Sequence, residues 1–117
     1  METHRLVLPE DLNHYGYLFG GRLVSWVDEA SWIAASLDYP DCRFVTIGMD
    51  RVEFRHSVRE GTILAIESEK VECRNTSVTY HVLVRRGRAQ AGEAIFRTQI
   101  TFVNVDQEGK KLPIPCS

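Results

Sequence analysis

The sequence predicts an α+β domain in which a curved antiparallel β-sheet wraps around one long α-helix. Only residues 19–37 repeat their apolar side chains at helical spacing. The segments that follow alternate apolar and polar residues with a period of two, which is typical of strands with one buried face. At about 12 residues, or roughly 40 Å, these strands are longer than a small flat sheet needs. We therefore expect the sheet to curve around the helix.

Length and composition indicate one globular domain that spans residues 1–117. The chain has 117 residues, of which 44% are hydrophobic and 26% charged, and its formal net charge is −2. These values argue against intrinsic disorder and against a strongly basic face that holds nucleic acid. No apolar run reaches the roughly 20 residues that cross a bilayer, and no signal-peptide pattern follows Met1. We expect a cytoplasmic protein without a membrane partner.

The chain begins with a short strand and a turn before the helix. Residues 5–8 are predicted as a brief strand that Pro9 ends, and residues 10–17 as a turn-like stretch. The helix extends over residues 19–37 and stops before Pro40.

This helix has apolar or small side chains on nearly all sides when it is viewed at about 100° per residue. The side expected to lie against the sheet comprises Phe19, Leu23, Trp26, Val27, Ala30, Ile33, Ala34 and Leu37. The opposite side comprises Gly21, Val24, Asp28, Ser31, Trp32 and Ala35. Because one sheet covers only one side, we expect a second subunit over the other. The sequence therefore predicts a homodimer at least, with tetramers and hexamers left open.

Four long strands are predicted after the helix, over residues 43–54, 62–74, 77–84 and 90–105. The first changes its apolar face near Gly48, as a β-bulge would. The last two are joined by a hairpin at residues 85–88. Each of these two places a set of apolar side chains on one face, namely Val78, Tyr80, Val82 and Val84 in one and Ala94, Phe96, Ile100 and Phe102 in the other.

The three cysteines are odd in number and widely spaced, at Cys42, Cys73 and Cys116, without a Cys-x-x-Cys pair. The histidines form no pair at metal-ligand spacing either. We therefore expect three free thiols and no metal site.

Two features of the helix could carry chemistry. Asp28 is a carboxylate in the middle of a mostly apolar side, which suits either an acid–base group or a structural ion pair with a partner arginine. Gly20 and Gly21 start the helix without a capping side chain, so their N–H groups could receive a ligand oxygen, or the glycines could merely allow close packing. Asn13 is by itself a turn former. The excess of arginine, 11 against 3 lysines, favours an anionic ligand.

The run from Pro9 to Gly21, together with residues 26–30, closely resembles the motif of hotdog-fold acyl-CoA thioesterases of the YciA and cytosolic acyl-CoA hydrolase type. Its most specific part reads Asn-x-x-Gly-x-x-Phe-Gly-Gly, with Asp28 placed 15 residues after Asn13. The resemblance continues, with looser motifs, in residues 45–54, 74–77 and 102–115. It therefore covers essentially the whole chain and implies a hotdog fold.

The resemblance also implies a site between two subunits, where the asparagine loop of one faces the helix aspartate of the other. Asp28 would then activate water as a general base or attack the thioester as a nucleophile. Asn13 would orient the water or bind the oxyanion. The N–H groups of Gly20 and Gly21 would polarise the thioester carbonyl.

Coenzyme A is part of the substrate in this family, and the resemblance implies no further cofactor. Its phosphates would be held by Arg74, Thr76 and Ser77, with Arg55 as a further candidate. Residues 74–77 are also a strand junction, where serine and threonine are ordinary turn residues.

Two other functions share this fold. A non-catalytic acyl-CoA sensor would need neither Asn13 nor Asp28 for water activation, so the presence of both favours the enzyme. A hotdog dehydratase resembles sites with a histidine paired to a carboxylate, and the helix contains no histidine. The dehydratase is therefore ranked last.

Overall fold

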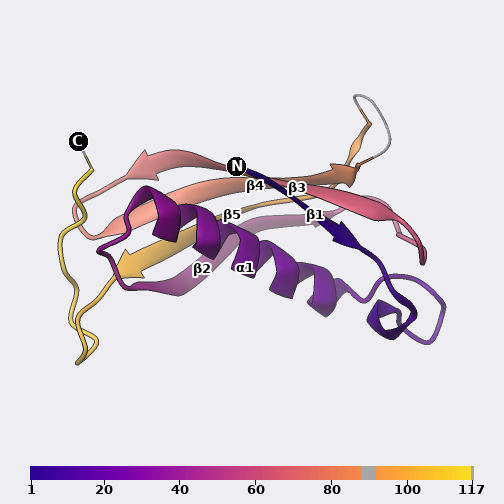
Figure 1. The fold of residues 1–117 in the computed structure, drawn as a ribbon, viewed down its shortest axis with the longest axis horizontal. Coiled ribbons are helices and arrows are strands. Elements are labelled where there is room, and N and C mark those ends of the chain that lie inside the picture. The colour runs from indigo at the N-terminus through magenta and orange to yellow at the C-terminus, as the bar shows by residue number, and fades with distance from the viewer. Residues whose placement is uncertain (88–91, 117) are drawn as a thin grey trace.

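The computed structural model describes residues 1–87 and 92–116. Its strands are β1 (Glu2–Leu6), β2 (Phe44–Phe54), β3 (Ile63–Cys73), β4 (Ser77–Arg86) and β5 (Ala94–Asn104), and its helices are the 3₁₀ helix η1 (Pro9–Asp11) and α1 (Gly20–Asp38). The strands form one antiparallel sheet in the order β1-β3-β4-β5-β2. Figure 1 shows α1 lying on one face of this sheet, with the helix extending along the long direction of the sheet. The predicted α+β architecture is confirmed.

The core lies between α1 and the inner face of the sheet. The alternation predicted for β4 is confirmed, because its four inward side chains are at most 1% exposed: Val78, Tyr80, Val82 and Val84. Phe96, Ile100 and Phe102 of β5 are fully buried beside them. Leu23 and Val27 of α1 pack against this layer. Burial of apolar surface here is the main force that holds the helix on the sheet.

The side of α1 that the sheet covers changes along the helix. Trp26 is buried as expected, but Ser31 and Ala35, which we expected to need a partner, are fully buried within the same chain. Conversely, Phe19 and Leu37 were expected to face the sheet and are 57% and 68% exposed. Because a sheet twists, its covered direction rotates relative to a straight helix. Phe19 also has an extended backbone before the helix, so helical spacing does not apply to it.

The edge strand β2 has two irregularities. One lies between Thr46 and Gly48, where the sequence predicted a bulge. The other lies between Asp50 and Glu53 and was not predicted. It contains Arg51, whose φ of 55° is in the left-handed region that non-glycine residues rarely adopt. The alternation of side chains between the two faces of the sheet is therefore interrupted twice along β2.

Apolar side chains remain exposed along this same edge strand. Four of them are between 42% and 61% exposed: Val45, Ile47, Val52 and Phe54. No strand in residues 1–87 or 92–116 pairs with the outer edge of β2. An unpaired edge with exposed apolar residues is a ready surface for another chain.

The first strand and the last hairpin differ from the prediction. The first strand spans Glu2–Leu6 rather than residues 5–8, and it is mostly polar and exposed. Its pairing with β3 rests on the backbone, which leaves no apolar alternation to detect. At the hairpin predicted for 85–88, β4 continues through Arg86. Arg88 and the predicted strand start at Gln90 lie outside the described residues.

The prediction of three free thiols is wrong for two of the cysteines. Cys73 and Cys116 form a disulfide, with their Cα atoms 5.8 Å apart and a sequence separation of 43. The pair forms because the C-terminal segment folds back along the end of β3, where the Ile114 N–H donates to the Asn75 carbonyl at 2.7 Å. Cys42 is a free cysteine.

A hydrogen bond from the core to the end of α1 gives a test of stability. The hydroxyl of Tyr80, a residue that is 1% exposed, donates to the Asp38 carboxylate. Burial is the main reason that the pKa of Tyr80 is raised. We expect Tyr80→Phe to lower the free energy of unfolding by about 1 kcal/mol, since one partly buried hydrogen bond is lost. Urea unfolding followed by circular dichroism measures this change, and Tyr15→Phe, at an exposed tyrosine, should leave it within error.

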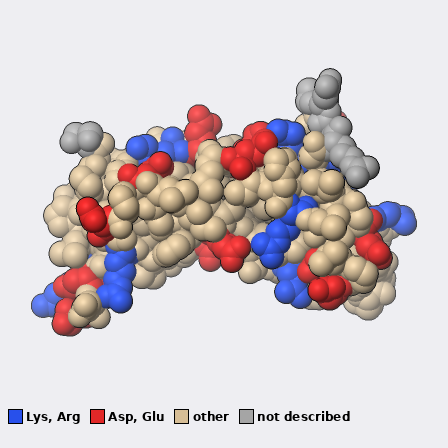
Figure 2. Space-filling model, in the orientation of Figure 1, with Lys and Arg blue, Asp and Glu red and all other residues tan. Residues whose placement is uncertain are grey.

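Charges of both signs are mixed on the surface. On the face seen in Figure 2, Lys and Arg side chains alternate with Asp and Glu. This distribution agrees with the formal net charge of −2. Within the described part of the chain, no helix has the length and apolar character required to cross a membrane.

Candidate active site

The start of α1 presents free backbone donors beside a cavity. Phe19 occupies the N-cap position and makes no side-chain cap bond, as predicted. The N–H groups of Gly20 and Gly21 have no acceptor among the described residues, whereas those of Arg22 and Leu23 already donate to the Phe19 carbonyl. The positive end of the helix dipole adds to these donors. Such a pair suits a carbonyl oxygen or an oxyanion.

Gly20 has less space around it than Gly21. A Cβ added at Gly20 would lie 3.4 Å from the Phe54 ring, whereas one at Gly21 would meet nothing closer than 3.8 Å. Gly20 borders a cavity of about 300 Å³ whose lining includes Leu23, Phe54 and Val58. Arg55 lines the same cavity, so the structure brings this predicted CoA ligand to the helix start. There its guanidinium donates a hydrogen bond to the Glu53 carboxylate at 2.9 Å and lowers the pKa of that carboxyl group.

Asp28 lies two turns further along α1 and is half-buried. It lies eight positions after Gly20, which corresponds to roughly 12 Å along the helix. Its Oδ1 accepts a hydrogen bond from the Thr46 hydroxyl at 2.8 Å, across the gap between α1 and β2. The other oxygen, Oδ2, has no hydrogen-bond partner in the described ranges. The carboxylate is thus fixed at one oxygen and available at the other.

Thr46 is a site residue that sequence reasoning missed. It lies directly before the bulge of β2, and a threonine in a strand is ordinary in sequence. The signal was its position within the resemblance, in the segment 45–54, but that position alone did not assign it a role. Only the packing of α1 on β2 brings it to Asp28.

We expect Thr46→Val to lower kcat about tenfold, because the Asp28 carboxylate loses the donor that orients it. Thr46→Ser keeps the hydroxyl and should retain most of the activity. Steady-state hydrolysis of an acyl-CoA, the reaction that the sequence resemblance implies, measures both variants. Equal activity of the valine and serine variants would show that the hydroxyl does not position Asp28.

Asn13 shapes its own loop and keeps one donor. Its Oδ1 accepts from the N–H groups of Tyr15 at 2.9 Å and Tyr17 at 3.1 Å. Gly16, with a φ of 87°, closes the turn by donating to the Asn13 carbonyl at 3.1 Å. The turn-forming role is therefore confirmed. Because both bonds use the oxygen, the side-chain nitrogen Nδ2 stays available as a donor.

Asn13 and Asp28 do not meet within one chain. The loop that carries Asn13 precedes α1 and lies beyond the start of the helix in Figure 1. Asp28 faces Thr46 of β2 instead. Any joint action of these two residues at one site therefore needs the loop of another chain.

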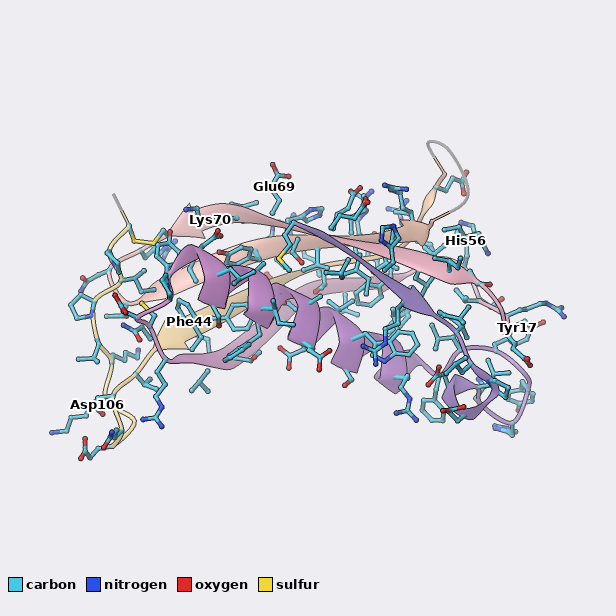
Figure 3. The ribbon with its side chains drawn as sticks, viewed as in Figure 1. Tyr17, Phe44, His56, Glu69, Lys70 and Asp106 are labelled. Carbon is cyan, nitrogen blue, oxygen red and sulfur yellow. A yellow bond between two sulfur atoms is a disulfide. The ribbon has the colours of Figure 1, made fainter. Side chains whose placement is uncertain are left out.

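The predicted CoA residues are divided between the two ends of the molecule. Arg55 lies at the helix start. Arg74 and Thr76 lie in the turn between β3 and β4, and Ser77 begins β4, at the same end of the sheet as the first residues of β2. Figure 3 shows these two ends by their labelled residues, with Phe44 at one and Tyr17 and His56 at the other.

Arg74 is already engaged at the surface of this turn. Its Nε donates to Glu72 at 2.8 Å, and its side chain is 72% exposed. Arg74 and Ser77 line a groove of about 290 Å³ together with Asp50 and Gln99. The groove is polar and open, and its lining places the carboxylates of Asp50 and Glu72 beside Arg74.

This arrangement, one helix wrapped by a five-stranded antiparallel sheet with free donors at the helix start, is the hotdog fold. Residues 15–93 match the model of the thioesterase superfamily. The chain belongs to this superfamily.

Curated relatives agree over nearly the whole chain. It is 31% identical to the acyl-CoA thioester hydrolase YciA of Escherichia coli, covering 94% of this chain and 86% of that protein. It is 30% identical to the cytosolic acyl coenzyme A thioester hydrolase of Rattus norvegicus, covering 94% of this chain. The chain spans only 30% of the length of that rat protein.

Solved structures include a hexameric hotdog-fold thioesterase of Campylobacter jejuni, 36% identical with a TM-score of 0.83, covering 96% of this chain and 87% of that one. Another is an acyl-CoA hydrolase of Staphylococcus aureus in complex with butyryl coenzyme A and coenzyme A. It is 29% identical with a TM-score of 0.84, covering 98% of this chain and 68% of that one. Solved structures of the same enzyme include variants in which an asparagine, an aspartate or a threonine is replaced by alanine. The spacing between that asparagine and that aspartate is the same as between Asn13 and Asp28.

Proposed function

We propose that the chain is an acyl-CoA thioesterase that hydrolyses acyl-CoA to a free acid and CoA. The observations that carry this proposal are the free N–H groups at Gly20 and Gly21 and the Thr46-held carboxylate of Asp28. They lie roughly 12 Å apart on one helix, so the N–H groups of one chain act together with the Asp28 carboxylate of a second chain. The donors suit the thioester carbonyl, and the carboxylate suits the water or the carbonyl carbon. The names of the relatives in Escherichia coli and Staphylococcus aureus support the same reaction.

The candidate residues act on different parts of this reaction. The Gly20 and Gly21 N–H groups polarise the carbonyl and stabilise the oxyanion. Oδ2 of Asp28 either takes a proton from the attacking water or attacks the carbonyl carbon itself. Nδ2 of Asn13 donates to the water or to the oxyanion. Hydrolysis changes no oxidation state, so the reaction needs no redox cofactor, and the roles proposed for these residues involve no metal.

A homodimer completes this site. The edge of β2 and its exposed apolar residues offer the surface for a second copy. A two-fold axis at the middle of β2 places the start of one β2 beside the end of the other. The 74–77 turn of one chain then comes to the helix-start end of its partner, where Arg55 lies. The hexameric assembly of the Campylobacter jejuni thioesterase supports an oligomer, and the name of the rat relative supports a cytoplasmic location.

The first test is the release of CoA thiol from short, medium, long and aryl acyl-CoAs, followed with a thiol reagent. Release from any of these substrates supports the hydrolase and identifies its acyl class. Binding of acyl-CoA without release would favour the sensor. Conversion of an enoyl thioester without thiol release would favour the dehydratase.

The CoA-binding assignment has its own test. We expect Arg74→Gln to raise KM about tenfold and to leave kcat nearly unchanged, because a phosphate contact is lost far from the reacting carbonyl. Arg5→Gln is the matched control, because it removes an equal charge from strand β1, the edge strand opposite β2. A KM that is the same in both variants and the wild type would remove Arg74 from the site.

A further inference from the structure

The C-terminal strap, residues 112–116, is bound to the end of the sheet by backbone contacts. The Leu112 N–H donates to the Asn104 carbonyl at 2.8 Å, and the Ile114 N–H donates to the Asn75 carbonyl at 2.7 Å. Ile114 is only 6% exposed and belongs to the core cluster. The strap therefore forms part of the packed structure at this end.

The strap and the 74–77 turn share one buried residue. The Asn104 backbone N–H donates to the Thr76 carbonyl at 3.0 Å, while its side-chain Nδ2 donates to the Pro113 carbonyl at 3.0 Å. Asn104 is 5% exposed, so each of these bonds is costly to leave unmade. A displacement of the strap is therefore transmitted to the turn.

The disulfide fixes both segments to each other. Cys73 directly precedes Arg74, and Cys116 lies two residues after Ile114, so the bond joins the base of the turn to the end of the strap. The turn itself is closed by the Arg74 N–H, which donates to the Ser77 carbonyl at 2.8 Å. One covalent bond and several hydrogen bonds thus converge on the segment that carries Arg74, Thr76 and Ser77.

We propose that Cys73 and Cys116 are positioning residues whose disulfide holds the 74–77 turn in the geometry that binds the phosphates of CoA. This inference rests on the proposed function. With the bond intact, the exposed Arg74 guanidinium is presented from a fixed backbone, so less conformational entropy is lost when a phosphate binds. With the bond broken, the strap loses its covalent link to Cys73 and is held only by its hydrogen bonds and by the burial of Ile114, so the turn becomes more mobile.

The thiol state therefore sets the affinity for acyl-CoA. A dithiol such as dithiothreitol breaks the Cys73–Cys116 bond by transferring two electrons and two protons to it. The reagent becomes a cyclic disulfide, and both cysteines become thiols. Disulfides in cytosolic proteins are usually redox-sensing or catalytic. A redox-sensing role is consistent with the position of the Cys73–Cys116 bond beside the proposed CoA site.

The experiment compares oxidised and reduced protein. Thiols counted after unfolding should number one in the oxidised chain, at Cys42, and three after reduction. Hydrolysis is followed by loss of thioester absorbance, because a thiol reagent would react with the reductant. We expect reduction to raise KM by about three- to tenfold with kcat unchanged. Cys116→Ser should show the raised KM without reductant and should not respond to it.

Cys42→Ser is the matched control. Burial and the nearby Asp41 raise the pKa of the Cys42 thiol, which makes it a poor nucleophile at neutral pH. Its serine variant should keep the KM of the wild type and the full response to reductant. Thermal unfolding midpoints of all forms show whether a variant has lost its fold, since an effect of folding alone would lower the active fraction and kcat rather than raise KM.

A second measurement separates this inference from the proposed function. Adenosine 3′,5′-bisphosphate carries the 3′-phosphate of CoA but no thiol, so its binding can be measured by calorimetry without reducing the disulfide. Weaker binding to reduced protein supports the inference even if no acyl-CoA is hydrolysed. Hydrolysis with a KM and a Kd that are independent of the disulfide would overturn it while the proposed function stands. Absence of binding to either form would also overturn it.

Discussion

Replacing Asp28 with alanine is expected to lower kcat about 10³-fold while the chain keeps its fold. The carboxylate has one oxygen held by Thr46 and one available for the reaction, and alanine removes both. Alanine is the best helix former and Asp28 is only half-buried, so the helix should tolerate the change. Release of CoA thiol at several substrate concentrations gives kcat and KM. Circular dichroism and size-exclusion chromatography test the fold and the oligomeric state.

Two further variants make this result specific. Glu29→Ala removes the neighbouring carboxylate, which is exposed and pairs with Arg5, and it should leave kcat unchanged. Asp28→Asn keeps an acceptor for Thr46 but loses the charge, so it should be nearly as inactive as the alanine variant. Full activity in a folded Asp28→Ala protein would contradict the catalytic role proposed for Asp28. A similar loss in Glu29→Ala would indicate an effect of helix charge in general.

The fold could be predicted where the burial of one face of an element makes apolar residues recur at a regular spacing in the sequence. Val78, Tyr80, Val82 and Val84 alternate because every second residue of β4 lies in the core. Strand β1 leaves no such pattern, since its residues are mostly exposed and its pairing uses backbone groups. The period therefore detects buried strands and misses a polar edge strand.

The covered side of α1 was only partly predictable for a related reason. Helical spacing assumes that the same direction is buried from end to end. The twist of the sheet moves this direction, so Ala35 is buried where Leu37 was expected to be. The second face of the helix therefore needs less cover from a partner than the sequence indicated, although Trp32 is still 43% exposed.

Candidate site residues could be selected from the sequence when their own type and spacing are unusual. An uncapped Gly20-Gly21 pair and a carboxylate at Asp28 stand out in sequence, whereas Thr46 does not, because its role depends on a contact across 18 residues. The same reason applies to Cys73 and Cys116. An odd number of cysteines still allows one pair, and only the return of the C-terminal strap brings these two together.

Exchange of the Asn13 amide for a carboxylate is expected to lower kcat about 10²-fold. Asn13→Asp keeps the Oδ1 acceptor that holds the N–H groups of Tyr15 and Tyr17, so the loop should retain its shape. The change removes only the Nδ2 donor and adds a negative charge where an oxyanion develops. Asn13→Ala would also open the loop, and it is therefore the less informative variant. Thiol release measures kcat, and unchanged thermal stability would show that the loop is intact.

Mixing this variant with Asp28→Ala tests whether each site is shared between two chains. If Asn13 and Asp28 of one site come from different subunits, a mixed dimer has one site with both lesions and one intact site. Co-refolding equal amounts makes half of the dimers mixed, so activity should recover to about one quarter of the wild type. Two different affinity tags verify that mixed dimers have formed. If verified mixed dimers stay inactive, both residues must come from the same chain. The Asn13 loop would then have to move from its place before Gly20 and fold back over α1.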